Sequence, residues 1–477
     1  MNRYKKLASD SVVMLIGTFG SKLLVFLLMP LYTAILSPSE YGTAELITGT
    51  ANLVMPFACM GITSGIFRFT MDKNANKAEV FSTSVAVLLI GMAGLLAVSL
   101  PVALFGGQTR AVVLVVLYVL LADLQAVCAQ YVRAIDRPVL FAGQGIFNTL
   151  FTILSNVLFL VVFDMGMTGY VLAVIVGNTA TTLLLVWRAK LWRVFSLSQV
   201  KRRTAGELLR FSLPMIPTTV CWLITDLSDR YFVSAICGEA ATGIYSAAYK
   251  IPTIVTLLSS IFMQAWQFSA VAESEDEEGC KRFYSEVFRG FLSLILAGTA
   301  VLILATPILC ELLLSDAYGE ARLYMPTLLV SAALGAIVSF LATVYLVQKK
   351  SLNSFYTSAA GMLLNLLGNA ILIPRIGVIG AAIATATSYG AVYLIRLWDT
   401  QRLMRFALHL PRQIIGILLL GASAICMTLS FDGRIALAAI LTAASIALHL
   451  PALLSDLKKL YLQRFGGEKM QKKQKKF

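Results

Sequence analysis

Charged residues are scarce in this sequence, making up 13% of its 477 positions, where a soluble domain carries about 25%. Apolar windows of roughly 20 residues recur along the whole chain, and this is the length that crosses a bilayer as a helix. No succession of segments alternates apolar and polar residues with period two, which disfavours a membrane β-barrel. The sequence therefore predicts an all-α polytopic membrane protein.

Paired cysteines and histidine clusters are also missing. The seven Cys occur singly and without a CxxC motif, as expected of small buried hydrophobes. With two His in the chain, His409 and His449, no zinc or His-based catalytic motif is apparent. A membrane glycosyltransferase would need acid and base groups on a sizeable loop, whereas the longest predicted outer connection, Glu311–Arg322, is short and lacks a DxD motif. We expect no enzyme activity, no cofactor and no metal beyond a monovalent cation site.

The apolar windows predict about 14 transmembrane helices. The first follows a basic N-terminus without an Ala-x-Ala cleavage site, so we expect it to be retained as a helix. The windows are 11–35, 43–67, 80–105, 111–131, 139–163, 167–187, 211–235, 241–270, 284–310, 325–347, 352–374, 378–398, 411–430 and 432–452.

The basic residues predict the orientation. If the N-terminus is cytoplasmic, the inner connections hold 31 Lys and Arg and the outer ones hold four, which is the bias that orients membrane helices. The net charge of +14 is then an orientation signal and a contact with membrane lipids rather than a nucleic-acid site. We expect a multi-pass protein of the plasma membrane with both termini in the cytoplasm.

A duplication is visible in the first twelve windows. The matching segments and residues are Gly166–Ala173 with Gly377–Ala384, Asn156 with Asn369, and Gly42 with Gly243. Six helices per copy keep both copies in the same orientation. The predicted parts are an N-lobe of helices 1–6 (1–187), a basic cytoplasmic linker (188–210), a C-lobe of helices 7–12 (211–400), helices 13 and 14 (401–452) and a basic cytoplasmic tail (453–477).

Two lysines fall at membrane depth, where an ionisable residue indicates a functional site by default. Lys22 lies roughly 15–20 Å from the cytoplasmic end of its window and Lys250 lands near the same depth. Together they could line a central cavity and bind a phosphate group. Alternatively, Lys22 forms a structural ion pair with Asp123 on the fourth helix.

A second group of polar residues falls in the outer half of the membrane. Asn365 and Asn369 are four apart, so they share one face of an apolar helix. A carboxylate, two amides and a hydroxyl lie at roughly 20–26 Å from the cytoplasmic ends of their helices: Asp226, Asn365, Asn369 and Thr385. Such hard oxygen ligands suit Na⁺, and the carboxylate could instead carry H⁺.

Two alternatives compete with that ion site. The polar residues could form a hydrogen-bond cluster that only holds helices 7, 11 and 12 together. Asp226 could also pair with Arg230, which follows it by four residues and lies next to Asp229.

Three motifs resemble the polysaccharide and lipid-linked oligosaccharide flippases of the multidrug/oligosaccharidyl-lipid/polysaccharide exporter superfamily, and the resemblance spans nearly the whole chain. They are the Leu36–Gly42 segment, Asp229-Arg230 followed by Gly243–Lys250, and the corner from Asn369 to Thr387. The resemblance implies two six-helix lobes that alternate access to a central cavity. It also implies that helices 13 and 14 are similar to the pair proposed to guide the prenyl tail in lipid II flippases.

The resemblance carries site residues as well. Those relatives place a sodium site on an Asp of helix 7, an Asn and an Asp of helix 11 and a Thr of helix 12, and the similar positions are Asp226, Asn365, Asn369 and Thr385. Asn369 departs from the second carboxylate of that site. The cationic cavity residues of the relatives are arginines, whereas this chain has Lys22 and Lys250.

The predicted function is therefore transport of an undecaprenyl-diphosphate-linked oligosaccharide from the cytoplasmic to the outer leaflet, coupled to Na⁺ or H⁺. The alternative on the same scaffold is a drug or cation antiporter. The expected partners are the lipid-linked glycan, membrane lipids and the enzymes that assemble the glycan, with no nucleic acid. No motif indicates which glycan is carried.

Overall fold

The computed structural model describes residue 26 and residues 28–72, 75–272, 277–348, 350–429 and 431–474. The chain divides into two compact units. Unit 1 comprises residues 1–246 and 313–318, and unit 2 comprises residues 247–312 and 319–477. The lobe boundaries drawn from the duplicated sequence stay a prediction.

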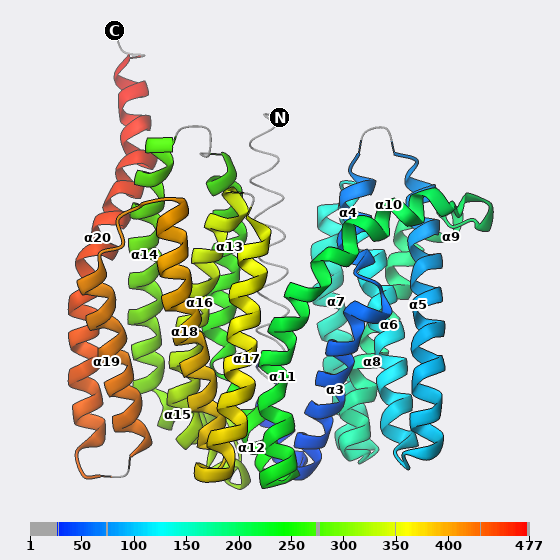
Figure 1. Cartoon of the computed structure of the whole chain (residues 1–477), viewed down its shortest axis with the longest axis horizontal. Helices are drawn as coiled ribbons and strands as arrows, with labels where there is room; N and C mark the ends of the chain where they lie inside the picture. Colours follow the sequence, from blue (N-terminus) through cyan, green and yellow to red (C-terminus); the bar gives the residue numbers. More distant parts are fainter. Residues whose placement is uncertain are drawn as a thin grey trace. The chain divides into compact units, whose positions relative to one another are not determined.

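The elements of unit 1 are helices that follow one another through short connections (Figure 1). In chain order they are α2 (Met29–Ile35), α3 (Pro38–Ala58), α4 (Ile62–Thr70), α5 (Lys77–Phe105), α6 (Thr109–Ala134), α7 (Pro138–Asn156), η1 (Val157–Val162), α8 (Gly166–Ala189), α9 (Leu191–Val194), η2 (Leu197–Gln199), α10 (Arg202–Ser212), η3 (Leu213–Met215), α11 (Ile216–Cys237), most of α12 (Glu239–Lys250) and η5 (Asp316–Tyr318).

Unit 2 is also helical over its described residues. Its elements are α13 (Thr253–Ala272), α14 (Glu277–Leu304), α15 (Thr306–Leu313, the last residue of which belongs to unit 1), α16 (Ala321–Val347), α17 (Ser351–Ile376), α18 (Ile379–Leu403), α19 (Leu410–Thr428) and α20 (Arg434–Gln474).

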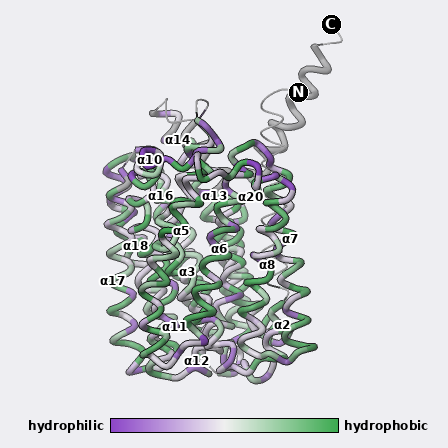
Figure 2. The backbone as a smooth tube through the Cα atoms, turned by 90° about the vertical axis from the view of Figure 1, so that its right-hand side faces the viewer, coloured by the Kyte–Doolittle hydropathy of each residue, from purple (hydrophilic) through white to green (hydrophobic). Residues whose placement is uncertain are grey.

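The outer faces of these helices are apolar. On α5, for example, Val98 is 70% exposed and is flanked by exposed Leu96 and Leu100, and Figure 2 shows hydrophobic residues along the full length of most helices. Apolar faces of this extent, on helices long enough to span a bilayer, suit contact with lipid. The protein is a multi-pass membrane protein, and the predicted all-α fold class is confirmed.

Among the described residues, ten helices are long and apolar enough to span a membrane, or twelve if each of two bent pairs is one span. The bent pairs are α3 with α4 and α12 with the start of α13. The predicted windows 11–35 and 378–398 have no counterpart in this set, and window 11–35 falls largely outside the described residues. The count of fourteen stays a prediction.

The core of unit 1 depends on a backbone crossing at two glycines. A Cβ atom on Gly243 would lie 1.8 Å from the carbonyl oxygen of Pro38, and one on Gly42 would lie 2.7 Å from the nitrogen of Gly243. Only glycine lets α3 and α12 approach this closely. Gly42 and Gly243 are positions that the duplication equates, so the repeat here is a pair of helix starts packed against each other.

A short segment after α15 completes this crossing. The backbone nitrogen of Ser315 donates to the Thr33 hydroxyl at 3.2 Å, and the Tyr318 hydroxyl donates to the Leu36 carbonyl at 2.9 Å. Tyr318 is fully buried and meets the edge of Tyr41. These contacts explain why residues 313–318 belong to unit 1 although they lie far from it in the sequence.

The core of unit 2 surrounds α16, most of which is buried. Phe340 of this helix stacks on Trp266 of α13 and on Phe291 of α14. The Thr343 hydroxyl, three residues further on, accepts hydrogen bonds from the Trp266 indole and the Tyr284 hydroxyl, both at 3.2 Å. Aromatic packing and satisfied polar groups together fix the helices around α16.

The corner between α17 and α18 is a tight reversal of the chain at one glycine. α17 continues through Pro374 to Ile376, Gly377 has a φ of +68°, and α18 begins at Ile379. A Cβ on Gly380 would lie 2.7 Å from the backbone carbon of Leu372. Gly166, which the duplication equates with Gly377, has a φ of +51° at the start of α8. Both glycines reverse the chain, so they serve the scaffold.

Candidate functional site

Three polar side chains form a chain of hydrogen bonds between α17 and α18. The Asn365 amide donates to the Thr385 hydroxyl at 3.0 Å, and the Asn369 amide donates to the side-chain oxygen of Asn365 at 3.2 Å. All three residues are at most 1% exposed. We call these residues the amide cluster. The structure thus brings together three of the four residues predicted for an ion site.

Small residues allow the amide cluster to form. A Cβ on Gly368 would lie 2.9 Å from the Cβ of Ala384, and one on Gly361 would lie 2.5 Å from Val392. Because α17 and α18 approach this closely, short Asn and Thr side chains reach across the interface. Interhelical bonds of this kind stabilise membrane helices by about 0.6 kcal/mol on average, so the geometry fits a helix contact as well as an oxygen-rich ion site.

Asp226, the fourth predicted residue, lies on α11 in unit 1. Its backbone carbonyl accepts a hydrogen bond at 3.1 Å from Arg230, one turn further along α11. The four-residue ion site and the side-chain pair of Asp226 with Arg230 both stay predictions.

Arg230 belongs to a buried ionic network in unit 1. Its guanidinium lies 4.0 Å from the carboxylate of Glu45 on α3 and donates to the Ser246 hydroxyl at 3.2 Å. Glu45 also accepts a bond of 2.9 Å from the Tyr170 hydroxyl on α8. An ion pair taken out of water needs such additional hydrogen bonds to offset its desolvation. The network ties α3, α8, α11 and α12 together.

Asp229 fixes the same helices from the neighbouring position. Its carboxylate, 1% exposed, accepts a hydrogen bond of 2.6 Å from Tyr245 on α12. Asp229 and Arg230 therefore both hold residues of α12 that belong to the Gly243–Lys250 motif. The residues of this motif thus fix the contact between α11 and α12 in unit 1.

The predicted cationic pair is described only in part. Lys250 is the last residue of α12, lies in unit 2 and is half-buried. Lys22 lies outside the described residues. The cavity formed by the two lysines and the pairing of Lys22 with Asp123 both stay predictions.

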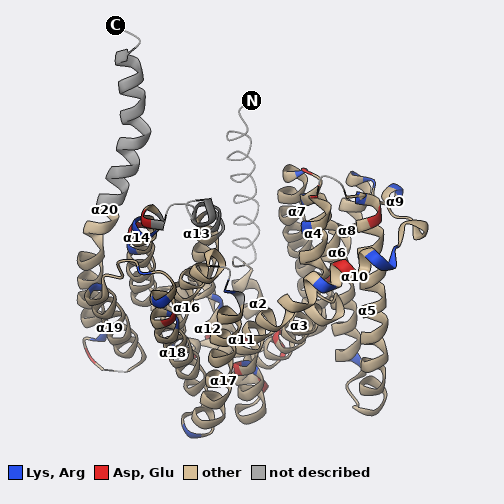
Figure 3. Cartoon of the chain, turned by 45° about the horizontal axis from the view of Figure 1, so that its top comes forward, with Lys and Arg blue, Asp and Glu red and all other residues tan. Residues whose placement is uncertain are grey.

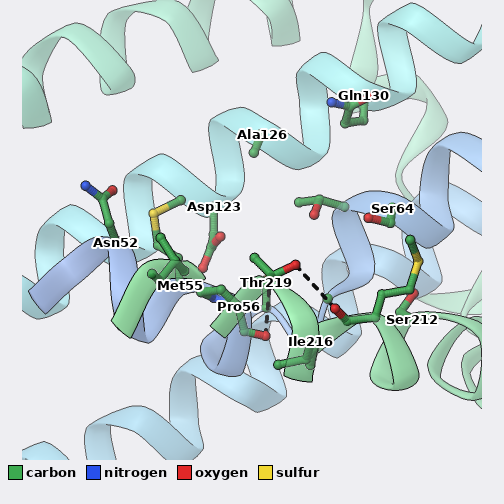
Figure 4. Close-up of a pocket in the computed structure, with 15 residues that line it drawn as sticks. Asn52, Met55, Pro56, Ser64, Asp123, Ala126, Gln130, Ser212, Ile216 and Thr219 are labelled. Carbon is green, nitrogen blue, oxygen red and sulfur yellow. Dashed lines mark hydrogen bonds between the residues drawn. The ribbon is translucent and has the colours of Figure 1, made fainter. Parts of the chain in front are cut away.

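Asp123 lies near the middle of α6 and is 1% exposed. Its Oδ2 atom has no hydrogen-bond partner among the described residues. The side chain borders a cavity inside unit 1 (Figure 4). Asp123 is therefore a buried acid of unit 1 that lies outside the network of Glu45 and Arg230.

Lys and Arg residues of unit 1 gather around α9 and α10 (Figure 3). This region contains the seven Lys and Arg from Arg188 to Arg210 that were assigned to the linker. α10 has a buried apolar position at Leu208 and exposed basic residues such as Arg203. A helix of this composition suits an interface between lipid headgroups and water.

A family model for polysaccharide biosynthesis proteins matches residues 7–268, more than half of the chain. The chain belongs to this family. One curated relative is the succinoglycan biosynthesis transport protein ExoT of Rhizobium meliloti (strain 1021), 26% identical over 248 residues. That match covers 51% of this chain and 49% of the relative, so the chain spans about half the length of the curated protein.

The fold is that of known exporters. The lipid II flippase MurJ in an inward closed conformation superposes with a TM-score of 0.71 at 14% identity, covering 95% of this chain and 100% of that chain. An inward-facing multidrug resistance MATE family transporter of the MOP superfamily has a TM-score of 0.65 at 15% identity, covering 82% and 98%. The resemblance stated from the sequence motifs is confirmed at the level of family and fold.

Two buried charged residues were missed by the sequence reasoning. Glu45 lies inside the second apolar window, where the rule that singled out Lys22 applies equally. Arg396 on α18 is 1% exposed and donates to the hydroxyls of Thr357 and Ser358 and to the Val338 carbonyl. Arg396 lies only two residues before the end of the window 378–398, so the count of basic residues assigns it to an inner connection.

Proposed function

We propose that this family member is a transporter that moves a lipid-linked oligosaccharide from the cytoplasmic to the outer leaflet by alternating access. The observation that carries the proposal is the combination of the family match with a flippase fold covering 95% of the chain. The carried lipid is an undecaprenyl diphosphate in this proposal, and the protein acts without chemical conversion of its cargo. The enzymes that assemble the glycan are its proposed partners.

The extent of the structural matches favours a flippase over a drug or cation antiporter. The multidrug transporter covers 82% of this chain and the lipid II flippase covers 95%. The difference is comparable in size to α19 and α20 together. An additional helix pair supports a role in holding a long prenyl tail, which a soluble drug does not need.

We place the protein in the plasma membrane with both termini in the cytoplasm. The support is the distribution of basic residues, 31 against four, together with the Lys and Arg residues around α9 and α10. In that orientation the basic region meets the anionic cytoplasmic leaflet.

We further propose that transport is coupled to Na⁺ or H⁺. The support in unit 2 is the buried amide cluster, whose oxygens are hard ligands. In unit 1, Asp226 is proposed as a coupling residue that carries the charge. Asp226→Asn is expected to export glycan without responding to the ion gradient. Unaltered gradient dependence in that variant contradicts the coupling proposal.

The test of transport uses a strain that lacks the gene. Surface glycan is expected to be lost and lipid-linked oligosaccharide to accumulate, and the wild-type gene restores export. Lys250→Glu is expected to abolish that rescue because it replaces a proposed phosphate-binding cation with an anion, whereas Lys250→Arg should retain it. Rescue by Lys250→Glu refutes the role of Lys250, and efflux of cationic dyes without glycan export favours the antiporter.

A further inference from the structure

Unit 1 contains a cavity of about 440 Å³ between α3, α4, α6 and the start of α11 (Figure 4). Ligand sites of small molecules commonly measure about 300–1,000 Å³, so the cavity has the size of a ligand site. None of the predicted coupling residues lines it. We call it the Asp123 pocket.

The pocket exists because the second membrane segment is broken. α3 and α4 are bent by 52° at residues 59–61, where Met60 and Gly61 have φ values of +50° and +66°. Pro56 has no N–H to offer to the carbonyl of Asn52, so the helix loses a hydrogen bond one turn before the break. Irregular backbone at membrane depth is tolerated where it lines a cavity.

Two buried polar groups face the pocket without a hydrogen-bond partner among the described residues. They are Oδ2 of Asp123, 1% exposed, and the hydroxyl of Ser212, fully buried. An unmade hydrogen bond at a buried carboxylate is costly, and the cost is larger for a charged group than for a neutral one. A ligand that donates hydrogen bonds would satisfy both groups.

The remaining walls combine amides, hydroxyls and apolar surface. Asn52, Gln130 and Thr219 supply side-chain donors and acceptors, while Met55 and Ile216 supply apolar contact. The lining contains no Lys, Arg or His. In Figure 4 the side chain of Asp123 points from α6 toward the start of α11, where Thr219 lies.

This composition discriminates between possible ligands. A diphosphate would meet an uncompensated carboxylate, because the lining lacks a cation. A single monovalent cation or a proton needs only a few close oxygens, and a space of 440 Å³ exceeds that requirement. A pyranose ring fits better, since its hydroxyls donate and accept hydrogen bonds and its C–H faces pack on apolar side chains.

We propose that the Asp123 pocket binds a neutral sugar residue of the carried glycan, with Asp123 and Gln130 as hydrogen-bonding groups and Met55 and Ile216 packed on the ring. The inference rests on the proposed function and adds a specificity: uronic acids and phosphates are disfavoured by the carboxylate. Because Asp123 lies about 17–21 Å from either end of α6, the sugar would bind at membrane depth rather than at the surface.

Protection from thiol labelling tests the proposal in the full-length protein in lipid nanodiscs. Thr219→Cys places a thiol at the exposed rim of the pocket, and native Cys237, exposed at the far end of α11, is the internal control. Peptide mass spectrometry follows a water-soluble maleimide at each position. Methyl glucoside at twice its Kd should slow labelling of T219C about threefold and leave Cys237 unchanged.

Three further probes identify the ligand class at equal ionic strength. Methyl glucuronide should protect the T219C thiol more weakly than methyl glucoside does. Pyrophosphate should give no protection, and NaCl should give no more protection than choline chloride. Protection by pyrophosphate makes the pocket an anion site, and protection by Na⁺ makes it a cation site. Either result, or no protection by any glycoside, overturns the proposal.

Variants assign the recognition to named residues. In the T219C background, Asp123→Asn should raise the Kd for methyl glucoside, read from the protection curve, about tenfold. The reason is that a hydrogen bond to a charged acceptor is stronger than one to a neutral acceptor. Gln130→Met, which keeps the side-chain volume, provides a second variant if the first does not fold. Undiminished protection in both variants refutes the assignment.

Failure of this inference is distinguishable from failure of the proposed function. If the wild-type gene does not restore glycan export, the transport proposal falls whatever the labelling shows. If it restores export but glycosides never protect T219C, only the sugar pocket falls.

Discussion

Two buried polar groupings, one in each unit, are built in different ways. In unit 1, the network of Glu45 and Arg230 is ionic and draws on Tyr170 and Ser246 for further hydrogen bonds. In unit 2, the amide cluster is neutral, and its members bond to one another across two adjacent helices. Buried charges need more partners than buried amides do, so the ionic solution couples more helices and the neutral solution stays local.

The close helix crossings also differ between the units, and changes at their glycines should have the largest effects on stability. Gly243→Ala would place a Cβ 1.8 Å from the Pro38 carbonyl oxygen, so α3 and α12 must separate and we expect little folded protein. Gly368→Ala in unit 2 meets the Cβ of Ala384 at 2.9 Å and should cost about 1–3 kcal/mol, as overpacking does. Yield and melting temperature after size-exclusion chromatography measure both.

Gly298→Ala is the matched control, because no atom lies within 4 Å of the added Cβ on α14. Its melting temperature should stay equal or rise. If G243A folds as well as G298A, the crossing of α3 and α12 is not the constraint described above.

Breaking the ionic network should have the next largest effect. Arg230→Met removes the guanidinium that lies 4.0 Å from the Glu45 carboxylate. Loss of one member of a buried ion pair costs about 3–5 kcal/mol of unfolding free energy, and at this separation we expect the loss to be no larger than that range. Glu45→Gln combined with Arg230→Met should recover part of that loss. Denaturant unfolding in detergent measures the coupling, and strictly additive effects would show that the two side chains do not interact.

The sequence predicted local relations better than distant ones. The amide cluster could be predicted because Asn365 and Asn369 are one helical turn apart and Thr385 lies just past the next corner. The contact of Glu45 with Arg230 could not be, because it depends on how α3 packs against α11, almost 200 residues later. The Asp123 pocket depends in the same way on a helix break whose signals, Pro56 and Gly61, were individually weak.

The neutral cluster should respond more mildly than the ionic network. Thr385→Val keeps the side-chain shape and removes the hydroxyl that accepts from Asn365 at 3.0 Å, so the loss should be about 0.6 kcal/mol and below about 1.7 kcal/mol. Thr387→Val is the control, since the Thr387 hydroxyl is exposed and donates to carbonyls of its own helix. Equal effects of both changes on denaturant unfolding would show that the bond to Asn365 contributes nothing.

Asn369→Asp is the smallest change and bears directly on whether the cluster binds an ion. A carboxylate beside Asn365 and Thr385 is costly unless a cation or a proton accompanies it, so the folded N369D protein should be stabilised by Na⁺ more than the wild type is. With Na⁺ at three times its Kd, the expected gain is about 0.8 kcal/mol, read as a melting-temperature rise in NaCl over choline chloride at equal ionic strength. If a proton takes this place, acidification should stabilise N369D instead and the two salts should act alike.

Asn148→Asp is the matched control, because the Asn148 amide bonds to Asn178 in a part-buried pair of unit 1 for which no ion is proposed. An N369D protein that responds to neither Na⁺ nor acid more than N148D does would show that the amide cluster is a helix contact alone.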